Sequence, residues 1–173
     1  ILIVLNTFVA NLMPMPVLAE PNGPFKVGTT FFHLVDQERR EEATANTTDA
    51  RSLWVQVWYP AEETESYNRM PALPDSERFM GDMFGKYGFP YFTAEYIPSI
   101  KSHSYLDAPI MSGNQSFPII LYSHGYNGNL SGNTQKAEAL ASHGYVVFGI
   151  AHSYETQISL REDGSWLTRT DSN

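Results

Sequence analysis

The chain of 173 residues contains no cysteine. Without thiols it has no disulfide framework, no thiolate nucleophile and no thiolate metal site, so cysteine chemistry is excluded. Basic residues are also scarce, with 11 Lys and Arg against 19 Asp and Glu and a formal net charge of -8. A chain with this charge lacks the basic surface that holds phosphate backbones, and we expect no nucleic-acid partner. His33 and His103 stand alone rather than in closely spaced pairs, so the sequence predicts no metal and no cofactor.

The sequence also has no apolar run long enough to span a bilayer unaided, because its apolar opening ends at Met13. Residues 1–20 instead fit a signal peptide, or the last turns of a transmembrane helix whose beginning is absent. A buried or loosely attached N-terminal helix is the third interpretation. The first two predict an extracytoplasmic protein, secreted or membrane-anchored, that associates with a membrane through its N-terminus.

The remaining chain has the composition of a soluble globular protein, with 42% hydrophobic and 17% charged residues. It starts at Ile1 rather than at Met, and its polar end, Asp163 to Asn173, shows no terminating element. We therefore expect one domain over residues 21–173 that is incomplete at the C-terminus.

Two early segments have the pattern of strands. Phe25 to Val35 is rich in β-branched and aromatic residues, and Leu53 to Tyr59 alternates before Pro60 stops it. We expect them to pair as an antiparallel hairpin, with the polar residues 36–51 as its loop. Residues 61–116 contain no clear strand; a short helix is predicted from Asp75 through Lys86, and another over Ala94 to Ser104 around Pro98.

The second half of the chain predicts a βαβ unit. Ile119 to Tyr122 is a continuous apolar run, typical of a central strand buried on both faces. A helical segment, Asn133 to His143, follows and ends at Gly144; Tyr145 to Ile150 then repeats the buried-strand pattern. A right-handed crossover of this kind predicts an α/β fold, with a mostly parallel sheet and helices on both faces. Trp166 to Thr168 is expected to start one strand of a hairpin.

The informative chemistry lies in the loop Ser123-His124-Gly125-Tyr126-Asn127-Gly128, directly after the first buried strand. Loops at the carboxyl ends of parallel strands hold the ligands of α/β proteins. Gly125 and Gly128 permit a tight turn, and a backbone N–H fixed in such a turn, here that of Tyr126, can stabilise the oxyanion of acyl transfer. A glycine-rich strand-to-helix turn without catalytic duty explains these six residues equally well.

Four blocks along the chain resemble α/β-hydrolases of the platelet-activating factor acetylhydrolase type, including their bacterial relatives. The blocks are Gly23-Pro24-Phe25-Lys26-Val27-Gly28-Thr29, Leu53-Trp54-Val55-Gln56-Val57-Trp58-Tyr59-Pro60-Ala61, Phe117-Pro118-Ile119-Ile120-Leu121-Tyr122-Ser123-His124-Gly125 and Leu140-Ala141-Ser142-His143-Gly144-Tyr145-Val146-Val147. The resemblance implies an α/β-hydrolase fold and a Ser-His-Asp mechanism, in which Tyr126 gives one oxyanion-hole N–H. It also implies that Ser123, His124, Gly125 and Gly128 support this loop, with His124 a structural part of it.

Such enzymes place the nucleophile in a Gly-x-Ser-x-Gly turn between a strand and a helix. No serine of this sequence has glycine at both positions. We therefore expect the nucleophile, the acid and the base beyond residue 173, and this chain alone to be inactive. His152 and Tyr154 follow the next strand near the rim of the expected pocket, where they either line it or have a structural role.

The resemblance implies a carboxylic ester hydrolase of lipid metabolism that cleaves short or oxidised acyl esters, with the sn-2 ester of a phospholipid as one candidate. A dienelactone-hydrolase-like or generic carboxylesterase is the alternative within enzymes. From other classes, a non-catalytic hydrolase-fold binding protein and a purely structural envelope domain remain open.

Overall fold

The computed structural model describes residues 17–74, 76, 97–125, 128–154, 156, 158–160 and 166–168. The predicted helix from Asp75 through Lys86 lies almost wholly outside the described residues. The described helices and strands, in chain order, are β1 (Lys26–Arg40), β2 (Ala50–Ala61), β3 (Arg69–Pro71), the 3-10 helix η2 (Ile97–Ser99), β4 (Lys101–Leu106), β5 (Ile119–Ser123), the 3-10 helix η3 (Leu130–Asn133), α3 (Thr134–Ser142), β6 (Val146–His152), β7 (Ile158–Leu160) and β8 (Trp166–Thr168).

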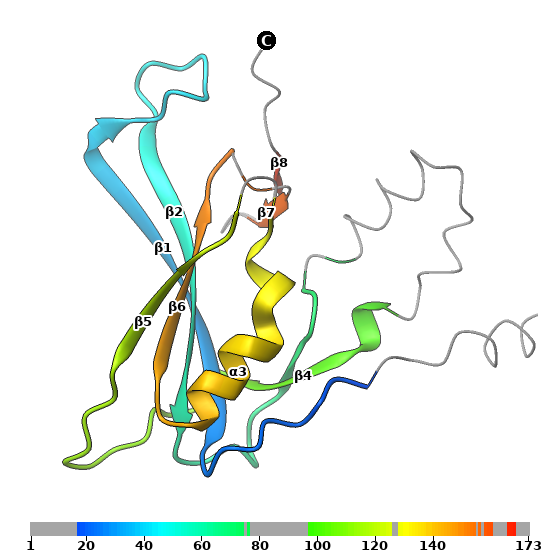
Figure 1. The fold of residues 1–173 in the computed structure, drawn as a ribbon. Coiled ribbons are helices and arrows are strands. Elements are labelled where there is room, and N and C mark those ends of the chain that lie inside the picture. Colours follow the sequence, from blue (N-terminus) through cyan, green and yellow to red (C-terminus); the bar gives the residue numbers. More distant parts are fainter. Residues whose placement is uncertain are drawn as a thin grey trace, which may run out of the picture.

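Six of the strands form one sheet in the order β3-β4-β1-β2-β6-β5, and β7 pairs with β8 separately (Figure 1). Three neighbouring pairs of the large sheet are antiparallel and two are parallel. The described sheet is therefore mixed, where the sequence predicted a mostly parallel one. The difference arises because the β1–β2 hairpin precedes the βαβ unit and joins the same sheet. Strand β8 pairs antiparallel with β7, so the predicted hairpin around Trp166 to Thr168 is confirmed.

The antiparallel pairing of β1 with β2 confirms the predicted hairpin, with Lys26 opposite Ala61 at its base. Both strands run further than predicted, because Asp36 still pairs with Arg51 and, after a register shift, Arg40 pairs with Ala50. Cross-strand pairing thus extends into residues that were expected to form a loop.

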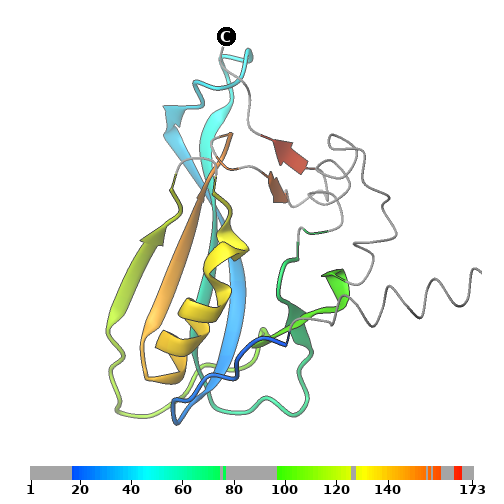
Figure 2. The ribbon, with the colours of Figure 1, turned by 45° about the vertical axis from the view of Figure 1, so that its right-hand side comes forward.

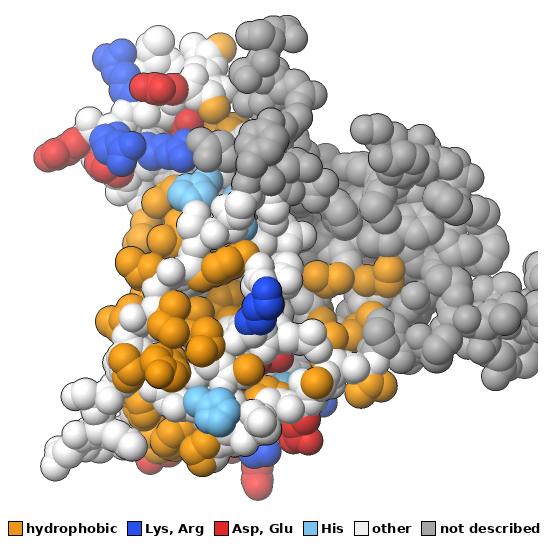
Figure 3. Space-filling view, viewed as in Figure 1, with side chains coloured by type: hydrophobic (Ala, Val, Ile, Leu, Met, Phe, Trp, Pro, Cys, Tyr) orange, Lys and Arg blue, Asp and Glu red, His pale blue; other side chains and the backbone are white. Residues whose placement is uncertain are grey.

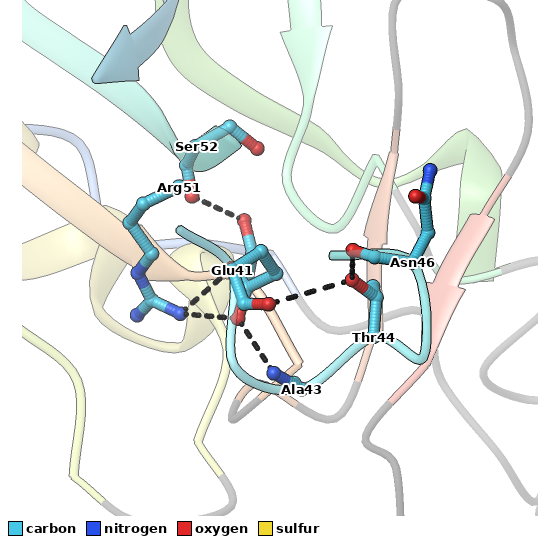
Figure 4. A network of polar contacts seen from close by, with 7 residues as sticks. Glu41, Ala43, Thr44, Asn46, Arg51 and Ser52 are labelled. Atoms are coloured by element: carbon cyan, nitrogen blue, oxygen red, sulfur yellow. Dashed lines mark hydrogen bonds and ion pairs between the residues drawn. The ribbon is translucent and has the colours of Figure 1, made fainter. Parts of the chain in front are cut away.

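A buried carboxylate closes the hairpin. Both carboxylate oxygens of Glu41 accept from Nη1 of Arg51, at 3.1 and 2.9 Å, and Oε1 also accepts from the backbone N–H of Ala43 at 3.0 Å (Figure 4). These bonds compensate for the burial of the Glu41 charge, since a buried carboxylate is tolerated where it is paired and hydrogen-bonded.

Strand β4 corrects two predictions. Residues 61–116 were expected to contain no strand, but Lys101–Leu106 pairs in parallel with β1, and β3 pairs with its other edge. The helix predicted over Ala94 to Ser104 is wrong for its described part, which contains only the three residues of η2 before β4 begins. The reason is tertiary: a sheet edge and a buried carboxylate hold β4, and neither leaves a signal in the local sequence.

That carboxylate belongs to Glu138 of α3, which is fully buried. Its Oε1 accepts from the backbone N–H of His103 at 2.6 Å and from the hydroxyl of Ser104 at 2.5 Å. Its Oε2 is buried without a hydrogen-bond partner among the described residues. Glu138 thus joins α3 to β4 through a single oxygen.

The predicted βαβ unit is confirmed as strand, helix and parallel strand, since β5 pairs in parallel with β6 and α3 connects them. The central position predicted for β5 is not seen within the described residues. Strand β5 is the outermost strand of the described sheet rather than a central one, and Ile119 and Leu121 are 65% and 71% exposed.

The core lies between α3 and one face of the sheet, as the two ribbon views agree (Figures 1 and 2). It is formed by one cluster of buried residues: Val27, Trp58, Ala137, Ala141 and Val147. A second cluster, Val55, Val57 and Tyr59, packs with partly buried side chains of β6. Gly28 makes this packing possible, because a Cβ there would clash with the ring of Tyr59. Figure 3 shows hydrophobic side chains gathered over the left-hand strands and charged ones at the hairpin tip.

Candidate active site

The loop singled out in the sequence begins where β5 ends. Ser123 is the last residue of β5 and pairs with Ile150 of β6, which itself ends two residues later at His152. Because the two strands are parallel, their carboxyl ends lie at the same edge of the sheet. The loops that follow Ser123 and His152 therefore start side by side, where α/β proteins hold their ligands.

A tight turn follows β5. The backbone N–H of Gly128 donates to the carbonyl of Gly125 at 2.8 Å. A Cβ at Gly128 would lie 2.9 Å from that carbonyl oxygen and 3.1 Å from Cβ of His124. Glycine at position 128 is therefore required by close approach of the backbone, and we call residues 125–128 the glycine turn.

His124 is buried and uses both ring nitrogens to hold this region. Its Nε2 accepts from the backbone N–H of His152 at 3.3 Å, so the ring proton lies on Nδ1, which donates to the carbonyl of Gly125 at 3.0 Å. An imidazole with both nitrogens bonded to backbone has neither free to take a proton from a nucleophile. The geometry favours a structural role for His124.

Ser123 and His152 form a second contact across the strand ends. The hydroxyl of Ser123 lies 2.7 Å from Nε2 of His152, and the rings of His152 and His124 meet edge to face at 5.4 Å between centroids. A serine hydroxyl at this distance from an imidazole is also the geometry of an activated nucleophile. Ser123 is exposed and stands at the end of a strand, without the glycine-flanked turn that presents such a nucleophile.

The loop after β6 joins the same cluster. Tyr154 has a φ of 66°, in the left-handed region that a non-glycine residue adopts only when its surroundings hold it there. Thr156 donates its backbone N–H to the carbonyl of His152 at 3.1 Å and its hydroxyl to the carbonyl of Gly128 at 3.1 Å. Thr156 was not predicted as a site residue, because its contact depends on how two loops distant in sequence come together.

A family model for platelet-activating factor acetylhydrolase, isoform II, matches residues 13–160 of this chain. The chain belongs to this family. The match covers the hairpin, the βαβ unit and the glycine turn, so the family resemblance inferred from the four sequence blocks is confirmed.

Two relatives are longer proteins, and this acetylhydrolase-family chain aligns with only part of each. It is 26% identical over 177 aligned positions to a probable 1-alkyl-2-acetylglycerophosphocholine esterase of Arthroderma benhamiae, covering 96% of this chain and 44% of that protein. It is 24% identical over 139 positions to platelet-activating factor acetylhydrolase of Cavia porcellus, covering 78% and 28%. The chain thus spans less than half the length of these relatives.

A solved structure confirms the fold class. The ferulic acid esterase from Streptomyces cinnamoneus superposes with a TM-score of 0.72 and 24% sequence identity, over 88% of this chain and 41% of that one. The α/β-hydrolase fold predicted from the sequence is therefore correct for this acetylhydrolase-family chain.

The structure brings most of the predicted site residues together at one sheet edge: Ser123, His124, Gly125, Gly128, His152 and Tyr154. Tyr126 lies outside the described residues, so its assignment as an oxyanion-hole donor stays a prediction. A cavity of about 180 Å³ lies elsewhere, between residues 20–27 and the β4 residues His103 and Tyr105, and it shares no lining residue with the glycine turn.

The described residues form neither a cluster of metal ligands nor a membrane-spanning helix. In the described part of the chain, no three His, Cys, Asp or Glu side chains gather as a metal site would require. Among the same residues, no helix is long and apolar enough to cross a membrane. The segment that carried the signal-peptide and anchor predictions, residues 1–20, is described only from residue 17, so those predictions stay untested.

Proposed function

We propose that this protein is a carboxylic ester hydrolase that works through an acyl-serine intermediate. The observation that carries the proposal is the glycine turn at the carboxyl ends of β5 and β6, closed by the bond between Gly128 and Gly125 and held by His124. In a chain of the acetylhydrolase family, such a turn is suited to present a backbone N–H to a developing oxyanion.

The proposed reaction has two halves. A serine beyond residue 173 attacks the ester carbonyl while a histidine takes its proton, and the same histidine then protonates the departing alcohol. Water next attacks the acyl-serine, the histidine takes a proton from the water, and the carboxylic acid leaves as the serine regains its proton. The N–H of Tyr126 and that of the residue after the nucleophile stabilise the negative oxygen in both halves. The 173-residue chain alone is inactive in this proposal.

The proposed substrates are esters with a short or oxidised acyl group, including the sn-2 ester of a phospholipid. Support comes from the relative named as a probable 1-alkyl-2-acetylglycerophosphocholine esterase. An extracytoplasmic location is proposed with it, on the apolar sequence of residues 1–20.

A soluble-ester carboxylesterase is the second candidate. The ferulic acid esterase of similar fold favours it, because that enzyme is named for an ester of ferulic acid rather than for a lipid. The two candidates differ in acyl and alcohol preference rather than in mechanism, and fold alone does not decide between them.

The test expresses the complete open reading frame beside the 173-residue chain and assays both on p-nitrophenyl acetate and on an sn-2 acetyl phospholipid. We expect the complete protein to hydrolyse both and the chain alone to hydrolyse neither. Activity on p-nitrophenyl acetate and a feruloyl ester without phospholipid hydrolysis favours the second candidate. A folded complete protein that hydrolyses none of these esters contradicts both and favours a binding protein.

A further inference from the structure

Strand β1 is paired over different lengths on its two sides. With β2 it pairs without interruption from Lys26 to Asp36. With β4 it pairs only from Val27 to Thr29. Figures 1 and 2 show the upper half of β1 at the rim of the sheet, where no described element lies beside it. We call residues 30–36, on the side away from β2, the open edge of β1.

The backbone groups of alternate residues point toward the open edge. Along a strand, the N–H and C=O of one residue point to one side and those of the next residue to the other. The carbonyl of Thr29 points to the β4 side, because it accepts from the backbone N–H of Asp107 at 2.8 Å. The register with β2 is unbroken as far as Asp36, so Phe31 and Val35 also direct their backbone groups outward. Among the described residues, no strand pairs with these two on that side.

The side chains of the open edge are apolar on both faces of the sheet. Phe31 and Val35 share the face of Val27, against which α3 packs, and they are 36% and 42% exposed. Phe32 and Leu34 lie on the other face and are 48% and 54% exposed. Proteins usually protect an exposed edge with lysine, proline or a bulge, and the open edge contains none of these. An edge of this kind readily pairs with another strand.

We infer that the open edge of β1 is a docking surface for a second copy of this chain, whose own open edge pairs with it antiparallel. The ends of the edge determine the register. At one end Asp107 occupies the position beside Thr29, and at the other the register of β1 shifts after Asp36. Residues 30–36 of one copy therefore face the same residues of the other in reverse order, about a two-fold axis at His33.

This register suits both the backbone and the side chains. Phe31 of one copy faces Val35 of the other, and because both direct their backbone groups outward, they form a hydrogen-bonded pair of an antiparallel ladder. Phe32 faces Leu34 on the opposite face, so apolar side chains meet on both faces. A shift by one residue would instead place Phe31 opposite Asp36, whose backbone groups point to β2. The open edge is thus self-complementary, as a two-fold dimer interface must be.

A second copy fits this edge better than an open-ended assembly does. Strand β1 has a single open edge, so pairing it with its own copy leaves none and stops at two chains. Beyond Asp36 the residues up to Arg40 are exposed and polar or charged, which confines apolar pairing to the open edge. So short a ladder predicts a weak dimer, with a dissociation constant of roughly 1–100 µM. The inference goes beyond the proposed function and uses no residue of the candidate active site.

Sedimentation velocity of the complete protein between about 1 and about 200 µM tests the inference, and we expect an equilibrium between monomer and dimer. Leu34→Lys places a charge on the pairing surface and is expected to raise the dissociation constant by about tenfold or more. Ile110→Lys is the matched control, because Ile110 is also 54% exposed but lies beside Ala61 at the base of the hairpin. It should leave the dissociation constant within about twofold.

Two results of this experiment overturn the inference. One is a complete protein that stays monomeric over the whole range, as it would if the rest of its chain covered the open edge. The other is an equal effect of Leu34→Lys and Ile110→Lys, which would place the interface elsewhere.

Single cysteines measure the register, since this chain has none of its own. In the proposed dimer, His33→Cys places two thiols on the axis with Cα atoms about 5.5 Å apart, within the range of a disulfide. Asp36→Cys places them about 20 Å apart. We expect oxidation to produce a cross-linked dimer of the first variant that is absent from the second and from the unmodified protein. No cross-link at position 33, or an equal one at position 36, overturns the inference.

A second variant keeps the test decisive if Leu34→Lys does not fold, as judged by circular dichroism and thermal unfolding. Val35→Pro removes an N–H that points outward rather than to β2, and edge strands tolerate proline for that reason. We expect it to fold and to raise the dissociation constant by about tenfold. A folded Val35→Pro variant that dimerises as strongly as the unmodified protein contradicts the inference.

Discussion

The backbone N–H of His152 donates to Nε2 of His124 at 3.3 Å, so an imidazole as well as the sheet joins the ends of β5 and β6. The other nitrogen of the same ring holds the carbonyl of Gly125. One buried side chain thereby contacts both the end of β6 and the first residue of the glycine turn.

Replacement of His124 by Phe keeps an aromatic ring but leaves the N–H of His152 and the carbonyl of Gly125 without these partners. We expect the free energy of unfolding to fall by about 1–3 kcal/mol, chiefly because the part-buried N–H of His152 loses its acceptor; the carbonyl of Gly125 still accepts from Gly128. Urea denaturation measures it. His143→Phe is the control, because His143 is exposed and its ring bonds to the side chain of Asn22 rather than to the backbone of a strand end. An equal fall in both variants contradicts the bridging role.

Ser123→Ala tests whether the exposed pair with His152 is catalytic or structural. If the nucleophile lies beyond residue 173, as proposed, we expect kcat on p-nitrophenyl acetate to stay within about tenfold of the unmodified protein. Loss of a true nucleophile lowers kcat by about 10⁴-fold or more. A loss of that size would assign the nucleophile to Ser123 and refute its proposed place downstream.

Glu138 offers a test of how α3 holds β4. We expect Glu138→Gln to be tolerated, because the amide oxygen can still accept from His103 N–H and from the hydroxyl of Ser104. Glu138→Leu leaves both donors unpaired, and we expect it to lower the free energy of unfolding by about 2–4 kcal/mol. Thermal and urea unfolding compare them, with the exposed Gln135→Leu on the same helix as control. If Glu138→Leu is as stable as Gln135→Leu, Glu138 does not hold α3 to β4.

Gly28→Ala places a methyl group against the ring of Tyr59, which is buried and bonds through its hydroxyl to the carbonyl of Ala108 at 2.7 Å. Overpacking of this kind costs about 1–3 kcal/mol of stability. The double variant Gly28→Ala with Tyr59→Leu removes the clash, and we expect it to be less destabilised than the two single changes summed. Strict additivity in urea denaturation would show that the two side chains do not meet.

Tyr59 also predicts a dependence on alkaline pH. Burial, and after it the negative charge of Asp107, raises the pKa of Tyr59 above its ordinary value of 10.0. The folded state therefore keeps this proton more tightly than the unfolded state. The resulting stabilisation is full below pH 10.0 and is lost as pH rises through the folded pKa.

The measurement is the free energy of unfolding between about pH 9 and about pH 11, compared between the unmodified protein and Tyr59→Phe. We expect the decline over this range to be steeper in the unmodified protein. Tyr145→Phe, a partly buried tyrosine on the other core cluster, is the control and should keep the steep decline. Parallel curves for the unmodified protein and Tyr59→Phe would contradict the prediction.

The sequence predicted the elements whose signal is local. Alternation before Pro60 indicated β2, and the apolar run, the helical segment and Gly144 indicated the βαβ unit. Gly144 has a φ of 92°, the left-handed conformation expected of a glycine that ends a helix.

The features that were missed depend on partners distant in sequence. The alternation of β4 is carried by Ser102 and Ser104, whose burial is made tolerable by contacts such as that with Glu138, so no apolar pattern marks the strand. Thr156 bonds to Gly128, 28 residues earlier in the chain, and no local sequence pattern predicts that contact.

The segment just before β1 is hydrogen-bonded to the end of helix α3. Gly23 donates its N–H to the hydroxyl of Ser142, across 119 residues, and Phe25 donates to the carbonyl of the same residue. A chain that emerges from the ribosome N-terminus first cannot make these bonds until α3 has been synthesised, nor can β2 gain β6 as its neighbour. During translation, the edge of β2 that faces away from β1 therefore stays unpaired until β6 has been synthesised. Because these contacts close a long loop, we expect completion of this sheet to be a late and slow step in folding.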